Sequence, residues 1–175
     1  MADDLDLPVQ SEMSWIPPAP ALIDEPLRQE AVERSGIRER KGDPQLRAIV
    51  EAAAREYEVR IAVISIIDGK RQWFAAQRGL QVDETPRAHA FCLHAIQRPG
   101  EPLVILDART DERFSANPLV TSNPFLRFYA GVPLLERDGY PVGALCIIDP
   151  QRRSRPPSVF QLIRLAREVE RIAGW

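Results

Sequence analysis

Two side chains with the chemistry of nucleophiles or metal ligands, Cys92 and His94, lie two positions apart in the segment RAHAFCLHAIQ. This segment is predicted to be helical, and residues two apart on a helix point to nearly opposite sides, so the pair cannot easily ligate one ion. Cys92 is therefore expected to be a small buried apolar residue. Cys146 lies in the strand-like segment GALCIID and is expected to be inert. Because the chain has no Cys-x-x-Cys spacing and only His89 as a further histidine, we expect two free thiols and no metal.

A second group of candidate residues lies in RFSANPLVTSNPFLRFYAGVPL, residues 113–134. Its two Asn-Pro breaks oppose a regular helix or strand and leave polar groups available to face a cavity. Arg113 and Arg127 could donate to a carboxylate or phosphate, and nearby aromatic rings could form apolar walls. These rings are Phe114, Phe125, Phe128 and Tyr129. The alternative is that Asp107 and Asp111 pair with the arginines and the rings fill the core, leaving no cavity larger than a water molecule.

The remaining carboxylates do not suggest hydrolysis or phosphoryl transfer. Asp68, Asp107, Asp111 and Asp149 lie at predicted strand ends and turns, where Asp commonly caps the backbone. None has a supporting histidine, and no glycine-rich phosphate loop is present. We therefore expect neither a hydrolase nor a kinase.

The elements around these residues predict an α+β fold. Asp43 and Pro44 begin a helix with one apolar face, and two predicted hairpins turn at Asp68-Gly69 and Asp138-Gly139. The segment PLVILD adds a short strand, and a final helix begins near Pro157. We expect an antiparallel sheet of five or six strands, with the N- and C-terminal helices on one face and residues 79–127 as a cover of loops and one helix over a pocket on the other.

Composition limits the partners and location. At 175 residues the chain fits one domain, and its net charge of −2 does not indicate nucleic acid or an anionic membrane as a partner. No apolar run reaches the roughly 20 residues of a membrane span, and the acidic N-terminus does not resemble a secretory signal, so a cytoplasmic location is expected. Residues 1–24 are rich in proline and predict an extended or disordered arm, and residues 25–175 the domain.

Several separated motifs resemble a GAF domain of the bacterial sensor type often found before diguanylate cyclase or histidine kinase modules. They are ISIID, RQWFAA, AFC-HAI, LVILDARTDERFSANPLV, RFYAGVPL and G-PVGALCIIDP, in that order. The resemblance implies a sheet of order 2-1-5-4-3, a small-molecule pocket under the cover and dimerisation through the terminal helices. On this basis, the expected ligand-binding residues are Phe91, Cys92, His94, Asp107, Arg113, Phe114, Asn117, Arg127 and Tyr129.

The resemblance does not name the ligand, so the cofactor is unknown. Covalent bilin attachment is not expected, because the segment TSNPFLR lacks the Cys-His pair of bilin photoreceptors. Free methionine sulfoxide reductases of this family use several cysteines, and DERFSANPLV has none where the catalytic thiol would lie. The Asn-Lys-x-x-x-Phe-x-x-x-Asp-Glu motif of cyclic-nucleotide GAF domains is absent.

These observations predict a non-catalytic, stand-alone sensory module that binds a small molecule and signals through its terminal helices to a second subunit or a separate output protein. One alternative is a closed-core interaction domain that dimerises through these helices, because Leu165 and Ile172 widen the apolar stripe of the last one. The other is a sulfoxide reductase that depends on Cys92.

Overall fold

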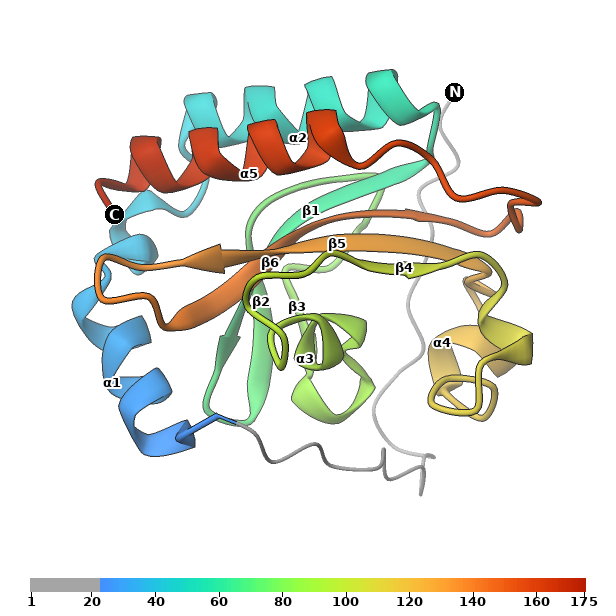
Figure 1. The fold of residues 1–175 in the computed structure, drawn as a ribbon, viewed down its shortest axis with the longest axis horizontal. Helices are drawn as coiled ribbons and strands as arrows, with labels where there is room; N and C mark the ends of the chain where they lie inside the picture. The colour runs from blue at the N-terminus through green and yellow to red at the C-terminus, as the bar shows by residue number, and fades with distance from the viewer. Residues whose placement is uncertain (1–22) are drawn as a thin grey trace.

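The computed structural model describes residues 23–175. The predicted arm, residues 1–24, therefore lies almost wholly outside the described residues. Figure 1 shows a sheet with two long helices on one side and shorter elements on the other. The helices are α1 (Glu25–Arg34), α2 (Pro44–Tyr57), α3 (Phe91–Ala95), α4 (Pro118–Thr121) and α5 (Phe160–Ala173), with the 3-10 turns η2 (Ile37–Arg40), η3 (Arg87–His89) and η4 (Ala108–Thr110).

The sheet is antiparallel and has six strands in the order β3-β2-β1-β6-β5-β4. The five predicted strands keep the predicted order 2-1-5-4-3, and the structure adds one short edge strand, β3, that pairs with β2. The strands are β1 (Ile61–Asp68), β2 (Arg71–Arg78), β3 (Glu84–Pro86), β4 (Leu103–Ile105), β5 (Phe128–Leu135) and β6 (Pro141–Asp149). The predicted α+β architecture is confirmed.

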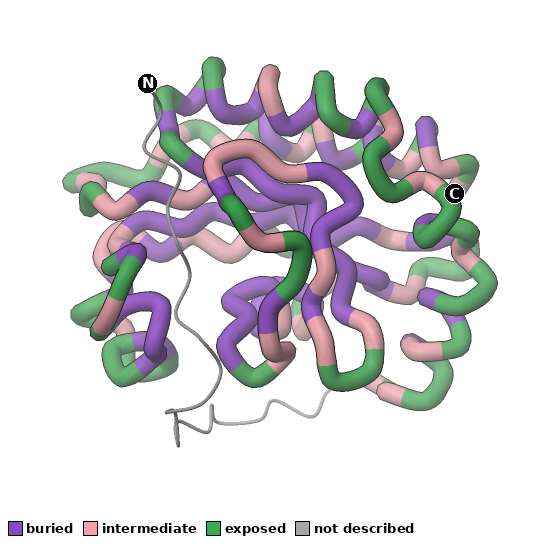
Figure 2. Tube along the Cα trace, turned by 180° about the vertical axis from the view of Figure 1, so that it is seen from behind, coloured by how far each residue is buried: buried purple, intermediate pink, exposed green. Residues whose placement is uncertain are grey.

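The helices α2 and α5 pack on one face of the sheet, and residues of α1 join the same apolar cluster. Asp43 caps α2 by accepting a hydrogen bond from the Gln45 amide at 2.8 Å, as its sequence predicts. The Tyr57 hydroxyl joins the two long helices, because it donates to the Ser158 carbonyl and accepts from the Leu162 amide. Figure 2 shows that buried residues concentrate in the strands, while exposed residues lie along the outer turns of the helices.

The N-terminal helical segment differs from its prediction. In the sequence, Leu27, Ala31, Val32 and Ile37 have helical spacing, which predicts one exposed helix from Pro26 to Arg40. In the structure, α1 ends at Arg34 and a separate 3-10 turn follows. Gly36 separates them because it adopts a left-handed conformation with φ of +70°. Arg28 in α1 is fully buried, so this helix is a part of the packed domain.

The opposite face of the sheet is covered by α3, α4 and the connecting turns, as Figure 1 shows. A second apolar cluster, separate from the first, fills the space between this cover and the sheet. In residues 23–175, no helix is both long enough and apolar enough to span a membrane.

Candidate functional site

A small cavity lies between the sheet and the cover. Its volume is about 40 Å³. It is lined by Ile61, Val63, Ser65, Gln72, Phe74, Leu80, Thr85, Phe91, Cys92, Leu119, Pro124, Leu126, Tyr129, Cys146 and Ile148. These residues come from β1, β2, β3, β5, β6, α3 and the α4 region, so the cavity is assembled by the whole cover and not by one loop.

The period of two along each strand decides which side chains reach this cavity. In β5, Phe128 packs in the cluster beneath the long helices, while Tyr129 faces the cover. Gly131 lies on the same side as Tyr129, and a Cβ atom there would come within 2.2 Å of the Tyr129 hydroxyl oxygen. Glycine at position 131 therefore leaves the space that the Tyr129 ring occupies.

One polar atom of the lining has no hydrogen-bond partner. Gln72 is only 6% exposed, and its Nε2 donates to the Thr85 hydroxyl at 3.0 Å. Its Oε1 is buried without a partner. A buried acceptor of this kind costs about 1–3 kcal/mol if nothing donates to it. Among the described residues, the walls of the cavity carry no Asp, Glu, Lys or Arg side chain, and Gln72 is the lining residue with a buried, unpaired side-chain oxygen.

Two thiols from distant parts of the chain also meet at the cavity. The Sγ atoms of Cys92 in α3 and Cys146 in β6 lie 3.6 Å apart, and the Tyr129 hydroxyl donates to the Cys92 Sγ at 3.3 Å. Both cysteines are free thiols, as predicted. The hydrogen bonds from Cys146, Ser65 and Tyr129 lower the pKa of Cys92 despite its burial. The hydrogen bond with Cys92, together with burial, raises the pKa of Cys146 well above its ordinary value.

Four aromatic rings continue from the cavity towards the surface. Phe91 lies 5.4 Å from Tyr129 and stacks on Phe114 at 4.1 Å between ring centroids, and His94 meets Phe114 edge-on at 4.7 Å. Burial, and secondarily the charge of Arg113, lower the pKa of His94 to about 4. His94 is consequently neutral at pH 7.

The two arginines of the 113–134 segment do not line the cavity. Arg113 forms an ion pair with Asp111 at 2.6 Å, and Arg127 donates to the carbonyls of Val120 and Leu126. The structure therefore does not place the guanidinium groups of Arg113 and Arg127 in the wall of this cavity, where the sequence interpretation expected anion-binding donors. The alternative, in which Asp107 and Asp111 pair with these arginines, is met only by Arg113 and Asp111, because Asp107 pairs with Arg109.

The nine predicted ligand-binding residues divide into three groups. Three of them line the cavity, namely Phe91, Cys92 and Tyr129. His94 and Arg113 line a separate surface groove, and Phe114 is completely buried between aromatic rings. Asp107 caps η4, and Asn117 caps α4 while its Nδ2 donates to the His89 carbonyl. Together with Arg127, these two polar residues shape the cover.

The strand residues of the lining were missed by the sequence reasoning. The sequence feature that could have indicated them is a polar residue among apolar neighbours, such as Ser65 in IAVISIID or Gln72 in RQWFAA. Period-two alternation separates two faces of a strand but does not say which face meets the cover. The thiol pair was missed because it joins residues 54 positions apart.

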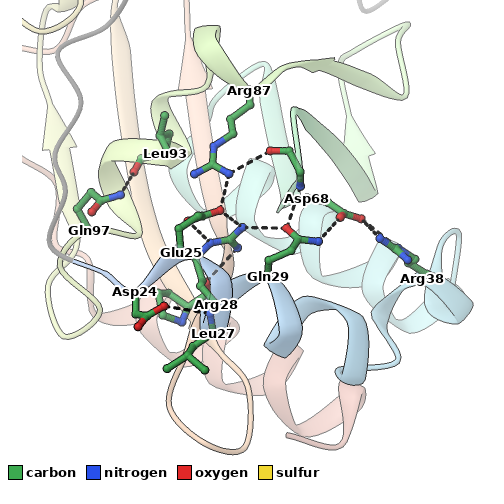
Figure 3. A network of polar contacts seen from close by, with 12 residues as sticks. Asp24, Glu25, Leu27, Arg28, Gln29, Arg38, Asp68, Arg87, Leu93 and Gln97 are labelled. Atoms are coloured by element: carbon green, nitrogen blue, oxygen red, sulfur yellow. Dashed lines mark hydrogen bonds and ion pairs between the residues drawn. The ribbon is translucent and has the colours of Figure 1, made fainter.

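An ionic network anchors α1 to the β1–β2 turn and to η3 (Figure 3). Glu25 accepts two hydrogen bonds of 2.8 Å from the buried Arg28 and one of 2.5 Å from Arg87 of η3. Arg87 also donates to the Gly69 carbonyl in the β1–β2 turn. Partial burial opposes ionisation of Glu25, but the hydrogen bonds from Arg28 and Arg87 outweigh it and lower its pKa to about 2.

The same turn is held by a second carboxylate. Asp68 accepts from Gln29 of α1 at 2.8 Å, from Arg38 at 2.6 Å and from the Trp73 indole at 3.1 Å. The Gln29 Oε1 accepts from the Gly69 amide at 2.9 Å. The first helix is therefore fixed to both the β1–β2 turn and the segment that leads into α3.

Comparison with known proteins identifies the family to which this architecture belongs. The model of the GAF domain matches residues 43–170. A curated relative, the cyclic di-GMP phosphodiesterase PA2567 of Pseudomonas aeruginosa, is 42% identical over 137 residues, which are 78% of this chain and 23% of that protein. The chain thus spans about a quarter of the length of this relative.

Solved structures show the same fold. The GAF domain of an Acinetobacter phosphoenolpyruvate-protein phosphotransferase has a TM-score of 0.58 and 17% identity, covering 85% of this chain and 93% of that one. The free methionine-R-sulfoxide reductase of Neisseria meningitidis, in complex with its substrate, has a TM-score of 0.59 and 18% identity, covering 93% and 96%. At these identities the likeness shows the fold alone.

Proposed function

This chain belongs to the GAF domain family, and we propose that it is a sensory module in which a small uncharged molecule occupies the cavity between the sheet and the cover. The observation that carries the proposal is the unpaired Gln72 Oε1 in an uncharged, mostly apolar lining. A ligand with one hydroxyl or amide donor would satisfy this oxygen once the Gln72 amide turns it towards the cavity, and would bury its apolar part against the walls. A charged ligand would leave water without an ionic partner among the lining residues.

The cavity volume limits the ligand further. A cavity of about 150 Å³ accommodates benzene, and this one is about 40 Å³. A molecule of a few heavy atoms fits the described arrangement. A nucleotide or tetrapyrrole would require the cover to move away from the sheet.

We propose that the terminal helices carry the output. Occupancy that displaces β3 or α3 would reach α1 through the ion pair between Arg87 and Glu25. The relative named a cyclic di-GMP phosphodiesterase suggests that the regulated activity is cyclic di-GMP turnover, located in a second subunit or an output protein. In this proposal the chain itself is not catalytic.

The test is a chemical-shift titration of the isotopically labelled chain with three probes of one skeleton: 1-propanol, propionamide and propionate. The neutral probes are expected to produce saturable shifts at the residues that line the cavity, and propionate to produce none there. Gln72→Met removes the acceptor oxygen, so it should weaken the binding of both neutral probes while leaving the fold unchanged. Absence of saturable shifts at the lining with either neutral probe would refute the binding site.

A closed-core interaction domain is the second candidate, because most of the space under the cover is filled. The sequence suggested this function through the wide apolar stripe of the last helix, but one chain already buries most of that stripe: Ile172 is only 8% exposed and Leu165 is half-buried. Phe160, 69% exposed at the start of α5, and Leu27, 40% exposed in α1, are the exposed large apolar side chains that the described terminal helices offer to a partner copy. Sedimentation equilibrium tests it, since a dimer that Phe160→Ser dissociates supports this function and a monomer at high micromolar concentration contradicts it.

The third candidate is a reductase that depends on Cys92. The neighbouring thiol of Cys146 favours it, because a second cysteine can resolve an oxidised first one. The uncharged lining disfavours free methionine sulfoxide, whose ammonium and carboxylate groups would find no ionic partner there. Turnover of this substrate, lost in Cys92→Ser, would establish the activity.

A further inference from the structure

The paired thiols beside the cavity are not used by reversible ligand binding, and their arrangement has a chemistry of its own. We propose that Cys92 and Cys146 form a redox sensor, in which a small hydroperoxide enters the cavity and oxidises the two thiols to a disulfide. The sensor goes beyond the proposed function, because it requires a reactive oxidant and no bound ligand.

The geometry suits one disulfide within the chain. The two Sγ atoms lie 3.6 Å apart, and a disulfide bond is about 2.05 Å long, so they must approach by about 1.5 Å. Cys146 lies in β6, which is hydrogen-bonded to β1 on one side and β5 on the other. Cys92 lies in α3, a helix of five residues in the cover. The shift therefore falls on α3, which moves towards the sheet.

The cavity suits a small neutral oxidant. Both thiols line it, its volume is about 40 Å³, and the described residues place no charged side chain in its wall. The polar side chains of Gln72 and Thr85, which are hydrogen-bonded to each other, lie in the same wall and offer oxygen atoms to a hydroperoxide O–H if the Gln72 amide turns towards the cavity. Hydrogen peroxide and short alkyl hydroperoxides have the required size, neutrality and donor.

The reaction proceeds in two balanced steps. The Cys92 sulfur attacks one oxygen of ROOH, the O–O bond breaks, and Cys92 becomes a sulfenic acid while its thiol proton leaves with the alkoxide as ROH. The Cys146 sulfur then attacks the Cys92 Sγ, the S–O bond breaks, and the departing hydroxide takes the Cys146 proton to form water. In sum, two thiols lose two electrons and two protons, and the hydroperoxide is reduced to ROH and water.

The hydrogen bonds assign the two roles. Cys92 accepts from the Tyr129 hydroxyl at 3.3 Å and contacts the Cys146 thiol, and both interactions favour its thiolate, the nucleophilic form. Cys146 retains its proton beside this developing charge and so follows as the resolving thiol. Tyr129 acts through Cys92 and is a positioning residue.

Disulfide formation also has a route to the first helix. The segment preceding α3 is η3, and its Arg87 holds Glu25 of α1 at 2.5 Å. A shift of α3 towards β6 therefore acts on the segment that anchors α1. The oxidised and reduced forms would differ in how firmly this helix is held.

The test treats the freshly reduced full chain with hydrogen peroxide, then unfolds it in the presence of N-ethylmaleimide and measures its intact mass. The expected product carries no maleimide, is lighter than the reduced chain by two hydrogen atoms and is restored by dithiothreitol. Peptide mapping should join Cys92 to Cys146 within one chain. Two maleimide groups on each chain after excess peroxide, or disulfides formed only between chains, would overturn the proposal.

Variants separate the roles. Cys146→Ser should stop at a Cys92 sulfenic acid that dimedone traps, and Cys92→Ser should leave Cys146 reduced. Tyr129→Phe should form the same disulfide about fivefold more slowly, the loss expected for one hydrogen bond to the nucleophile. This last variant serves if a cysteine variant fails to fold. Equal peroxide reactivity of the two single cysteine variants, or an unchanged rate in Tyr129→Phe, would contradict the assigned order.

Discussion

Replacing Gln72 and Thr85 together by apolar residues of similar shape should stabilise the domain. In the native chain, Gln72 Nε2 bonds the Thr85 hydroxyl while Gln72 Oε1 is buried without a partner. The double variant Gln72→Met with Thr85→Val removes both bonded groups, which is nearly neutral, and also removes the unpaired oxygen. We expect a gain of about 1–3 kcal/mol in the free energy of unfolding.

The single variants give the comparison that isolates the unpaired oxygen. Thr85→Val leaves both the amide nitrogen and the amide oxygen of Gln72 buried without partners, so it should cost about 1–3 kcal/mol. Gln72→Met should be close to wild type, because loss of the unpaired oxygen offsets loss of the bond to Thr85. The same substitution at Gln29, whose Nε2 and Oε1 are both paired, is the matched control and should destabilise the domain.

Urea unfolding followed by tryptophan fluorescence measures these differences. With a slope of about 2 kcal/mol per molar urea, a gain of about 2 kcal/mol moves the midpoint upwards by about 1 M. A double variant less stable than the native chain would contradict this prediction, because it would show that Gln72 contributes to stability like an ordinary paired core amide.

Three other perturbations test separate parts of the structure. The pKa of Glu25 is about 2 in the fold against 4.5 in the unfolded chain, so its contribution to stability should be present above pH 4.5 and lost as the pH falls towards 2. The acid unfolding curve of Glu25→Gln should lack this component. An unchanged pH dependence in that variant would contradict the role of Glu25. Burial lowers the pKa of His94 from 6.5 to about 4, so between these values the unfolded chain binds a proton that the folded chain does not. The free energy of unfolding should therefore fall as the pH drops from 6.5 to 4. A His94 imidazole resonance that titrates near pH 6.5 in the folded chain would refute this. Gly131→Ala places a Cβ atom 2.2 Å from the Tyr129 hydroxyl and should lower the melting temperature through a loss of about 1–3 kcal/mol, whereas Gly100→Ala, with no atom within 4 Å, should not.

The sequence predicted the parts of the fold that depend on local chemistry. Asp43 and Pro44 begin α2, and the Asp-Gly dipeptides mark both hairpins, because capping and turn geometry act over a few residues. The order of the five main strands came from the family resemblance. The break at Gly36 was missed because an apolar spacing can continue across a residue whose backbone is not helical.

The site was predicted less well, for a physical reason. Arginines and aromatic rings in an irregular segment have the same composition whether they face a ligand or satisfy the segment itself. In the structure, Arg113 pairs with Asp111 two residues away, and Arg127 bonds carbonyls within seven residues. Local partners were sufficient for both. By contrast, the contact between Cys92 and Cys146 depends on how α3 lies across β6, which no short-range pattern specifies.

The one strand that the sequence did not predict connects the cavity to the first helix. In β3, Thr85 bonds Gln72 at the cavity, and Arg87, two residues later, bonds both Glu25 and the Gly69 carbonyl. A three-residue edge strand has few ladder hydrogen bonds, so it yields more readily than the central strands. Under both proposals, a molecule in the cavity or a shift of α3 towards the sheet would act on this short segment. The contacts of Thr85 and Arg87 make β3 and η3 a continuous route from the cavity to α1.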